Sequence, residues 1–230
     1  MYGFQIYNSG GKIQITGEEM SLPIRETGSK TVFYLRENGN VYGNVVEFPT
    51  SVFVNGSMLF MSPPNGNGNI RYIAMYPFVD NKVRIQTSTV GTHTYVLTQA
   101  DSSAGPTTGY GLKVLNSNGL GLAFNSNESY LVITQQISIP FSASSPSFSG
   151  SVNISTSPYT NKRPYFSVPS VYGVRLYAGY GDAFYTFILD AAVSNGVLSY
   201  TVTKSGPGNF PSIVGRDPNH VFQINVGVLT

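Results

Sequence analysis

The chain has 230 residues, of which 41% are hydrophobic, so it is long enough to bury one large core or two ordinary ones. Charged residues make up only 10% of it, the net charge is +2 and no basic run occurs, which argues against binding nucleic acid through its phosphates. Cysteine is absent, which excludes disulfides and thiolate metal sites, and no apolar run is long enough to predict membrane insertion.

Apolar and polar residues alternate along the first half of the chain, and helical periodicity is nearly absent. Turn residues separate these segments, for example at residues 37–40 and 63–69. Two prolines and alternating glycines in residues 63–69 predict an exposed tip that joins no sheet. The predicted strands of this half are residues 3–7, 12–16, 31–36, 51–54, 58–61, 71–76, 82–87 and 94–98.

The second half has the same pattern, with turn signals at residues 194–196 and 206–208. Its Ser-rich stretch at residues 141–150 predicts a long loop. The predicted strands are residues 111–115, 119–125, 130–135, 149–155, 171–177, 184–189, 198–204 and 222–228. Short strands separated by frequent turns are typical of sandwiches and barrels, so the sequence predicts an all-β fold.

One phrase occurs twice, as Tyr-Gly-Phe-Gln-Ile-Tyr-Asn-Ser-Gly-Gly at residues 2–11 and as Tyr-Gly-Leu-Lys-Val-Leu-Asn-Ser-Asn-Gly at residues 110–119. Each reads as an apolar strand followed by a tight turn. We therefore expect two β-sandwich-like modules that arose as a duplicated unit, with Gly11 and Gly119 at hairpin turns. A weaker third copy at residues 172–181 is interpreted as a hairpin of similar design.

A polar stretch of small residues at 101–109 precedes the second phrase and is the best candidate linker. The predicted domains are accordingly residues 1–104 and residues 105–230.

Residues that could carry catalysis are scarce. His93 and His220 lie 127 residues apart (220 − 93), and no Gly-x-Ser-x-Gly elbow surrounds any serine, so neither a hydrolytic triad nor a zinc site is predicted. Glycoside hydrolysis needs two facing carboxyl groups, and the sequence identifies no such pair, although Glu47, Asp182 and Asp190 are where a search would begin. We expect a protein that is not an enzyme, with no catalytic residue, no metal and no cofactor.

Aromatic residues are more suggestive, because the chain has 16 Tyr and 14 Phe but no Trp. Tyrosine buries its ring while its hydroxyl stays wet, which suits both protein interfaces and sugar-binding faces. A possible contact surface consists of Tyr159, Tyr165, Tyr180 and Tyr185. The alternative is that these rings cover the ends of a sandwich core, and the absence of Trp weakens the case for a carbohydrate-binding module.

The opening phrase, continued by Lys12 and Ile13, resembles the start of small tail-associated virion proteins of tailed bacteriophages. In these proteins a Tyr-Gly-x-x-(Val/Ile)-(aromatic or apolar)-Asn-x-x-Gly hairpin begins at or next to the initiator Met. The resemblance covers about a dozen residues, and the second phrase extends it in kind to the other half of the chain. It implies a structural component of the tail tip, baseplate or fibre that binds other virion tail proteins and is oligomeric in the particle.

A second hypothesis is a receptor-binding or adhesin-like module that contacts a glycan or protein on the host surface. A structural subunit should be bound in the particle without affinity for cells, whereas an adhesin should bind cells by itself. Met1 leads directly into the first predicted strand without a basic start and an apolar stretch, so no signal peptide is predicted. We expect a protein made in the host cytoplasm and located in the virion tail.

Overall fold

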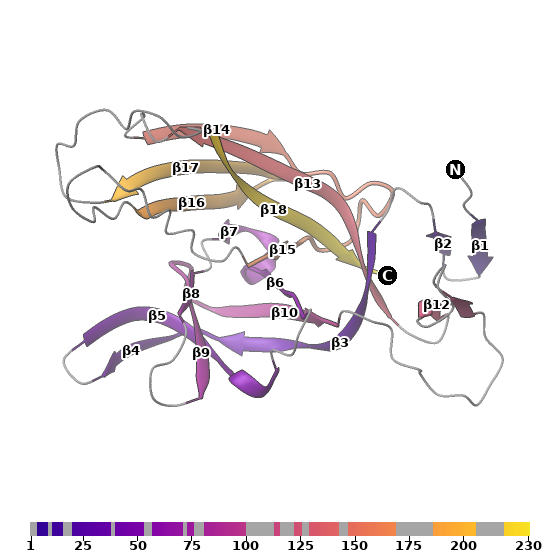
Figure 1. Cartoon of the computed structure of the whole chain (residues 1–230), viewed down its shortest axis with the longest axis horizontal. Coiled ribbons are helices and arrows are strands. Elements are labelled where there is room, and N and C mark those ends of the chain that lie inside the picture. The colour runs from indigo at the N-terminus through magenta and orange to yellow at the C-terminus, as the bar shows by residue number, and fades with distance from the viewer. Residues whose placement is uncertain are drawn as a thin grey trace.

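The computed structural model describes residues 4–8, 11–15, 20–37, 40–52, 57–70, 73–75, 81–99, 113–115, 122–125, 129–142, 147–168, 186–205 and 219–230. Every regular element in these ranges is a β-strand or a single turn of 3-10 helix, which confirms the all-β prediction (Figure 1). The 3-10 turns are η1 (Thr50–Val52) and η2 (Pro64–Gly66). The strands are β1 (Phe4–Asn8), β2 (Gly11–Ile15), β3 (Met20–Thr31), β4 (Phe33–Glu37), β5 (Asn40–Pro49), β6 (Leu59–Ser62), β7 (Gly68–Asn69), β8 (Ile73–Met75), β9 (Lys82–Gln86), β10 (Thr92–Thr98), β11 (Lys113–Leu115), β12 (Leu122–Asn125), β13 (Tyr130–Ser142), β14 (Ser147–Asn153), β15 (Tyr165–Ser167), β16 (Thr186–Ser194), β17 (Val197–Ser205) and β18 (Asn219–Leu229).

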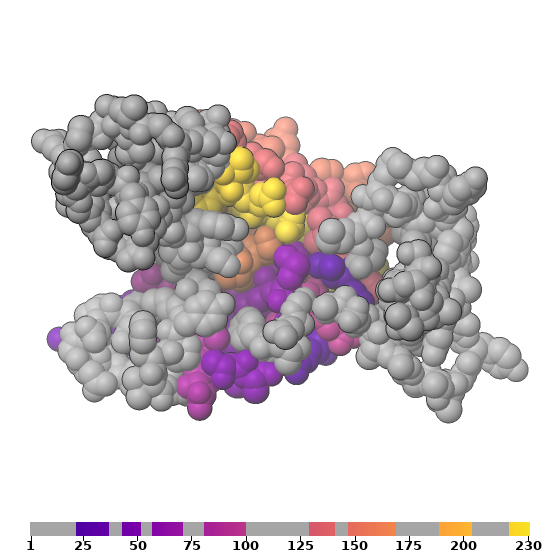
Figure 2. All heavy atoms as spheres, viewed as in Figure 1, coloured from indigo at the N-terminus to yellow at the C-terminus, as the bar shows by residue number. Residues whose placement is uncertain are grey.

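Six strands close into a barrel in the order β10-β3-β13-β18-β15-β6, and all pairs between neighbours are antiparallel. Three of these strands precede residue 104 and three follow residue 105. Figure 2 shows the indigo and magenta residues of the first half packed against the yellow residues of the last strand in the middle of the molecule. The predicted boundary at residues 104 and 105 lies outside the described residues, and the strands on its two sides share one barrel.

Two four-stranded antiparallel sheets lie beside the barrel. One has the order β4-β5-β9-β8, and the other has the order β14-β17-β16-β7. In Figure 1 the first sheet lies at the lower left of the view and the second at the upper left, and we call them the lower and the upper sheet. The short strand β7 crosses between the two halves of the chain, because it follows β6 in the sequence but pairs with β16.

One large core cluster connects both sheets with the barrel. Val46 and Phe48 enter it from β5, Leu198 and Val202 from β17, and Met61 from the barrel, all of them at most 3% exposed. A smaller cluster contains Phe60, Val96, Leu131 and Tyr165. Because β-strands direct alternate side chains to opposite faces, Phe60 and its neighbour Met61 fall into different clusters.

Both copies of the repeated phrase lie in antiparallel hairpins, but these hairpins differ in register. In the first, Asn8 faces Gly11, so a two-residue turn joins β1 and β2. In the second, Leu115 faces Leu122 and the register shifts after Val114, so the connection is six residues long (116–121). The duplication is therefore not confirmed. The turn residues 9 and 10, Gly119 and the third copy at residues 172–181 lie outside the described residues.

Several local predictions were wrong. Residues 68–69 of the predicted tip pair with β16. Residues 50–52 form the 3-10 turn η1 where a strand was expected to begin at residue 51. The Ser-rich stretch at 141–150 was expected to be a loop, but its ends belong to β13 and β14.

Candidate functional site

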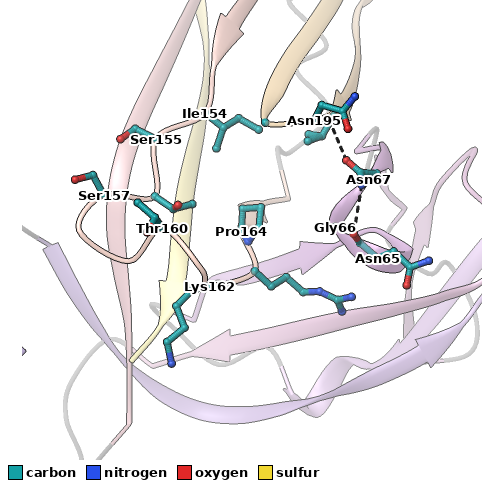
Figure 3. A pocket seen from close by; sticks show the side chains of 14 residues that line it. Asn65, Gly66, Asn67, Ile154, Ser155, Ser157, Thr160, Lys162, Pro164 and Asn195 are labelled. Atoms are coloured by element: carbon teal, nitrogen blue, oxygen red, sulfur yellow. Dashed lines mark hydrogen bonds between the residues drawn. The ribbon is translucent and has the colours of Figure 1, made fainter. Parts of the chain in front are cut away.

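A pocket of about 530 Å³ opens where three connections meet (Figure 3). They are residues 65–67 at the end of η2, residues 154–164 between β14 and β15, and residues 193–196 at the hairpin between β16 and β17. Positive φ angles at Asn65 (56°), Asn195 (50°) and Gly196 (76°) form the turns that bring these segments together. Asparagine and glycine tolerate such angles best, so the turn residues of the sequence build the rim of the pocket.

Hydrogen bonds join the three segments to one another and to the barrel. The backbone N–H of Asn195 donates to Oδ1 of Asn67 at 3.2 Å, and the N–H of Ile154 donates to the carbonyl of Gly196 at 2.7 Å. Ser155 is held to β13, because its N–H donates to Oε1 of Gln135 at 2.8 Å. These bonds attach each wall to a strand, so the pocket is largely formed before a ligand arrives.

Most of the residues that line the pocket are polar, and two of them are cations. Asn65, Asn67 and Asn195 contribute amide groups, and Ser155, Ser157 and Thr160 contribute hydroxyls from the opposite side of the view in Figure 3. Lys162 and Arg163 supply two cations, and none of the described residues that line the pocket carries a carboxylate. Nη1 of Arg163 donates to Oγ1 of Thr94 at 3.1 Å, which attaches this cation to strand β10 of the barrel.

This arrangement can donate and accept hydrogen bonds and can attract an anion. Ile154, Pro164 and Val193 add an apolar part of the wall. The described lining residues do not supply the facing carboxyl pair that glycoside hydrolysis uses. The described lining therefore offers hydrogen-bonding groups, positive charge and a small apolar surface.

The second candidate site is the outer edge of β14. This strand pairs with β17 without a register shift, from Ser147 opposite Thr203 to Asn153 opposite Val197, and no other described strand pairs with its far side. Five of its seven residues are exposed, and the strand contains neither a charged residue nor proline. Unpaired strand edges of this kind bind other strands readily.

The direction of the backbone groups of β14 follows from two hydrogen bonds near its end. Ile154 donates its N–H toward Gly196, beside β17, whereas the carbonyl of Asn153 faces the other way and accepts from Nε2 of Gln135 at 3.1 Å. In an antiparallel strand both polar groups of one residue point to the same side and alternate along the chain. Ser147, Ser149 and Ser151 therefore direct their N–H and C=O groups away from β17.

Comparisons with known proteins do not identify a relative. The chain matches no family model, no curated protein and no solved structure. Any assignment of function thus depends on the residues themselves.

The structure describes two of the four tyrosines that were predicted to form a contact surface. Tyr165 is 7% exposed and packs in the smaller core cluster, so its ring lies inside the fold. Tyr159 is half-buried in the connection after β14, where its carbonyl accepts from the N–H of Lys162 at 2.9 Å. Tyr180 and Tyr185 lie outside the described residues. A surface shared by all four side chains stays a prediction, although Tyr165 contributes little area to it.

The titratable residues considered for catalysis lie on three different strands where their side chains are described. His93 is completely buried, and its Nε2 donates to the carbonyl of Thr89 at 2.9 Å, while burial lowers the pKa of its imidazole. Glu47 pairs with Arg84 at 2.9 Å and with Lys82 at 3.1 Å. Asp190 lies on β16, in a different sheet from Glu47, and the side chains of Asp182 and His220 are not described.

Two further searches of the described residues are negative. No group of three or more His, Cys, Asp or Glu side chains in this part of the chain could hold a metal ion. None of its helices is long and apolar enough to span a bilayer.

Sequence reasoning missed both candidate sites. It identified the turn at residues 194–196, but nothing in the sequence showed that this turn meets residues 65–67. It placed a strand at residues 149–155, two residues later than β14, and assigned the first part of β14 to a loop. The signal that could have found the edge is the uncharged alternation of residues 147–153.

Proposed function

We propose that this chain is a structural component of the tail of a tailed bacteriophage, at the tail tip, baseplate or fibre, and that it acts through contacts with other tail proteins. The opening hairpin phrase supports this proposal, together with the low charge and the all-β fold. The observation that carries it is the uncharged and unpaired edge of β14, because such an edge adds readily to the sheet of another subunit. The proposal includes a location in the virion, no catalytic activity and no binding of nucleic acid.

Mass spectrometry of purified phage particles tests this proposal directly. We expect the chain to be present in a fixed copy number per particle and to remain after washing at high salt, because burial and strand pairing are less sensitive to salt than surface ion pairs. A chain that is found only in the lysate and never in particles contradicts the proposal. A separate assay uses the purified chain, and release of sugar from host capsule or lipopolysaccharide by that chain contradicts the absence of catalysis.

A second function, binding to the host surface, is favoured by the pocket between residues 65–67, 154–164 and 193–196. Its amides, hydroxyls and two cations suit a hydroxyl-rich or acidic group on a surface glycan or protein. The purified chain should then bind host cells by itself, and Lys162→Ala should weaken that binding. Lys82→Ala is the matched control, because Lys82 is an exposed cation on the other sheet and pairs with Glu47. Equal binding by both variants contradicts a role for the pocket.

A further inference from the structure

We propose that β14 pairs antiparallel with β14 of a second copy of this chain, about a two-fold axis that passes through Gly150. The strand reads Ser-Phe-Ser-Gly-Ser-Val-Asn, and its residues match in kind from both ends toward the central glycine. In this register Ser149 faces Ser151 of the second copy and Phe148 faces Val152. Ser147 faces Asn153, whose outward carbonyl already accepts from Gln135 of its own chain, so the new backbone hydrogen bonds are those of Ser149 and Ser151. A two-fold interface needs such self-complementarity, because the same patch serves both partners.

The backbone of β14 fits this register. The serines at 147, 149 and 151 direct their N–H and C=O groups away from β17, as the bonds of Asn153 and Ile154 indicate. Centring the pair on residue 150 places each odd-numbered residue opposite another odd-numbered one. Ser149 of one copy and Ser151 of the other can then exchange both of their backbone hydrogen bonds. A register centred between two residues would instead place outward-facing groups opposite residues that face inward, and the match of side chains in kind selects Gly150 among the registers centred on a residue.

The side chains fit it as well. Phe148 is 36% exposed although it lies on the same face as Val152, which packs against the core. Pairing would place each Phe148 beside the Val152 of the other copy and cover both. At the axis Gly150 has no Cβ, and the ring of Tyr200 already covers it, so the two strands can approach as closely as an antiparallel pair requires.

Charge and length distinguish β14 from the other edges of the two four-stranded sheets. β4 carries Arg36 and Glu37, and its register shifts between Leu35 and Arg36, features that protect an edge from pairing. β7 and β8 have only two and three residues. β14 has seven residues, a regular ladder and no charge that would repel a second copy. Pairing would extend the order β7-β16-β17-β14 directly into the same sheet of the second copy.

The proposed dimer gives the structural protein one partner, a second copy of the same chain. Only the occurrence of this dimer in the phage particle rests on the proposed function. Self-association is measured on the purified chain, whereas the proposed function is measured on phage particles. A dimer that is absent from particles would contradict the function alone. A monomer that is present in particles would contradict the pairing alone.

Sedimentation velocity of the full chain tests the pairing. We expect a species of about twice 24.8 kDa that is favoured as concentration rises. The double variant Ser149→Lys/Ser151→Lys should be monomeric, because each lysine would face another lysine across the axis. Ser199→Lys/Thr201→Lys is the matched control, since these residues lie on β17 directly opposite Ser151 and Ser149. It should remain dimeric. A wild-type chain that stays monomeric at every concentration overturns the proposal, and so does a control that dissociates as fully as the edge variant.

Cysteine crosslinking tests the register and keeps the proposal falsifiable if the lysine variants do not fold. The chain has no cysteine of its own, so introduced thiols report only their own positions. In the proposed pair the Cα atoms of residue 149 and residue 151 of the other copy lie about 5.5 Å apart, within the range of a disulfide. Ser149→Cys/Ser151→Cys should give a covalent dimer on mild oxidation, whereas Ser147→Cys alone should not, because residue 147 faces residue 153. A dimer linked through residue 147, or none from the double variant, overturns the proposed register.

Discussion

The ring of Tyr95 on β10 lies directly over Gly28, its partner on the neighbouring barrel strand β3. A Cβ at residue 28 would stand 2.8 Å from Oη of Tyr95 and 2.9 Å from its Cζ and Cε1 atoms, closer than packed atoms approach. The same ring meets Phe48 edge-on, with the centroids 5.0 Å apart, and its hydroxyl donates to the carboxylate of Glu26. The glycine thus makes room for a tyrosine that joins the barrel to the lower sheet. Gly150 and Tyr200 repeat the arrangement in the upper sheet.

Gly28→Ala should therefore destabilise the protein by about 1–3 kcal/mol, because the added methyl group forces the Tyr95 ring out of its place. Chemical denaturation measures the change in the free energy of unfolding. In the double variant Gly28→Ala/Tyr95→Ala the alanine at 28 should cost much less, since the ring that it would meet is gone. Additive costs would contradict the close contact.

Tyr95 should make stability fall at high pH. Burial, followed by the hydrogen bond to Glu26 and the charge of that carboxylate, raises the pKa of the Tyr95 hydroxyl to about 12, above its ordinary value of 10.0. Between these values the unfolded chain has lost the phenolic proton while the folded chain keeps it, so stability declines as pH rises from about 10 toward 12. Urea denaturation over this range should show a shallower decline in Tyr95→Phe than in the wild type. An unchanged slope would exclude Tyr95 as its source.

His93 should act at the other end of the pH scale. Burial lowers its pKa below 6.5, although the hydrogen bond to the carbonyl of Thr89 acts in the opposite direction. Below about pH 6.5 the unfolded chain takes up a proton that the folded chain does not, so stability falls as pH decreases. His93→Phe should be less stable than the wild type at neutral pH, because it loses the bond to Thr89, but it should lose less stability on acidification. Thermal unfolding at pH 7 and pH 5 compares the two slopes, and parallel slopes would contradict this role.

The ion pairs of Glu47 should differ in strength. The side chain of Arg84 is 11% exposed, whereas that of Lys82 is 47% exposed. Glu47→Ala removes the carboxylate from the buried guanidinium and should cost about 1–3 kcal/mol, since a buried charged donor loses an acceptor. Lys82→Ala should cost less than about 1 kcal/mol, as exposed pairs do. Denaturation of both variants in the same buffer compares the costs, and equal costs would contradict the ranking.

Turns with a strong local signal could be predicted from the sequence. Asn195 and Gly196 take the positive φ angles of a two-residue hairpin, and β17 follows close to its predicted bounds, whereas β16 continues to Ser194, beyond the predicted end at residue 189. The turn at residues 37–40 was also predicted, and it joins β4 to β5, although no strand was predicted where β5 lies. In both cases the residues that define the turn are adjacent in the chain, so local chemistry determines the structure.

Strands defined by distant partners could not be predicted. Pro23 and Gly28 interrupt the apolar pattern of β3, which exists because β10 and β13 pair with its two ends. β5 was missed for a related reason, since Gly43 has a φ of 77° beside a register shift. Both candidate sites depend on such placement. Asn67 and Asn195 meet at the pocket although 128 residues separate them, and β14 is an edge only because of the order of its sheet.

Because three neighbouring strands from the first half of the chain and three from the second half together form the barrel, it cannot close before β18 has been synthesised. β18 is the last of the six strands in chain order and pairs with both β13 and β15. A nascent chain that has not yet released β18 from the ribosome holds an open sheet whose apolar residues have no cover, and contacts so distant in sequence form slowly. A premature stop codon before residue 219 should thus yield a chaperone client or an aggregate rather than a smaller working protein.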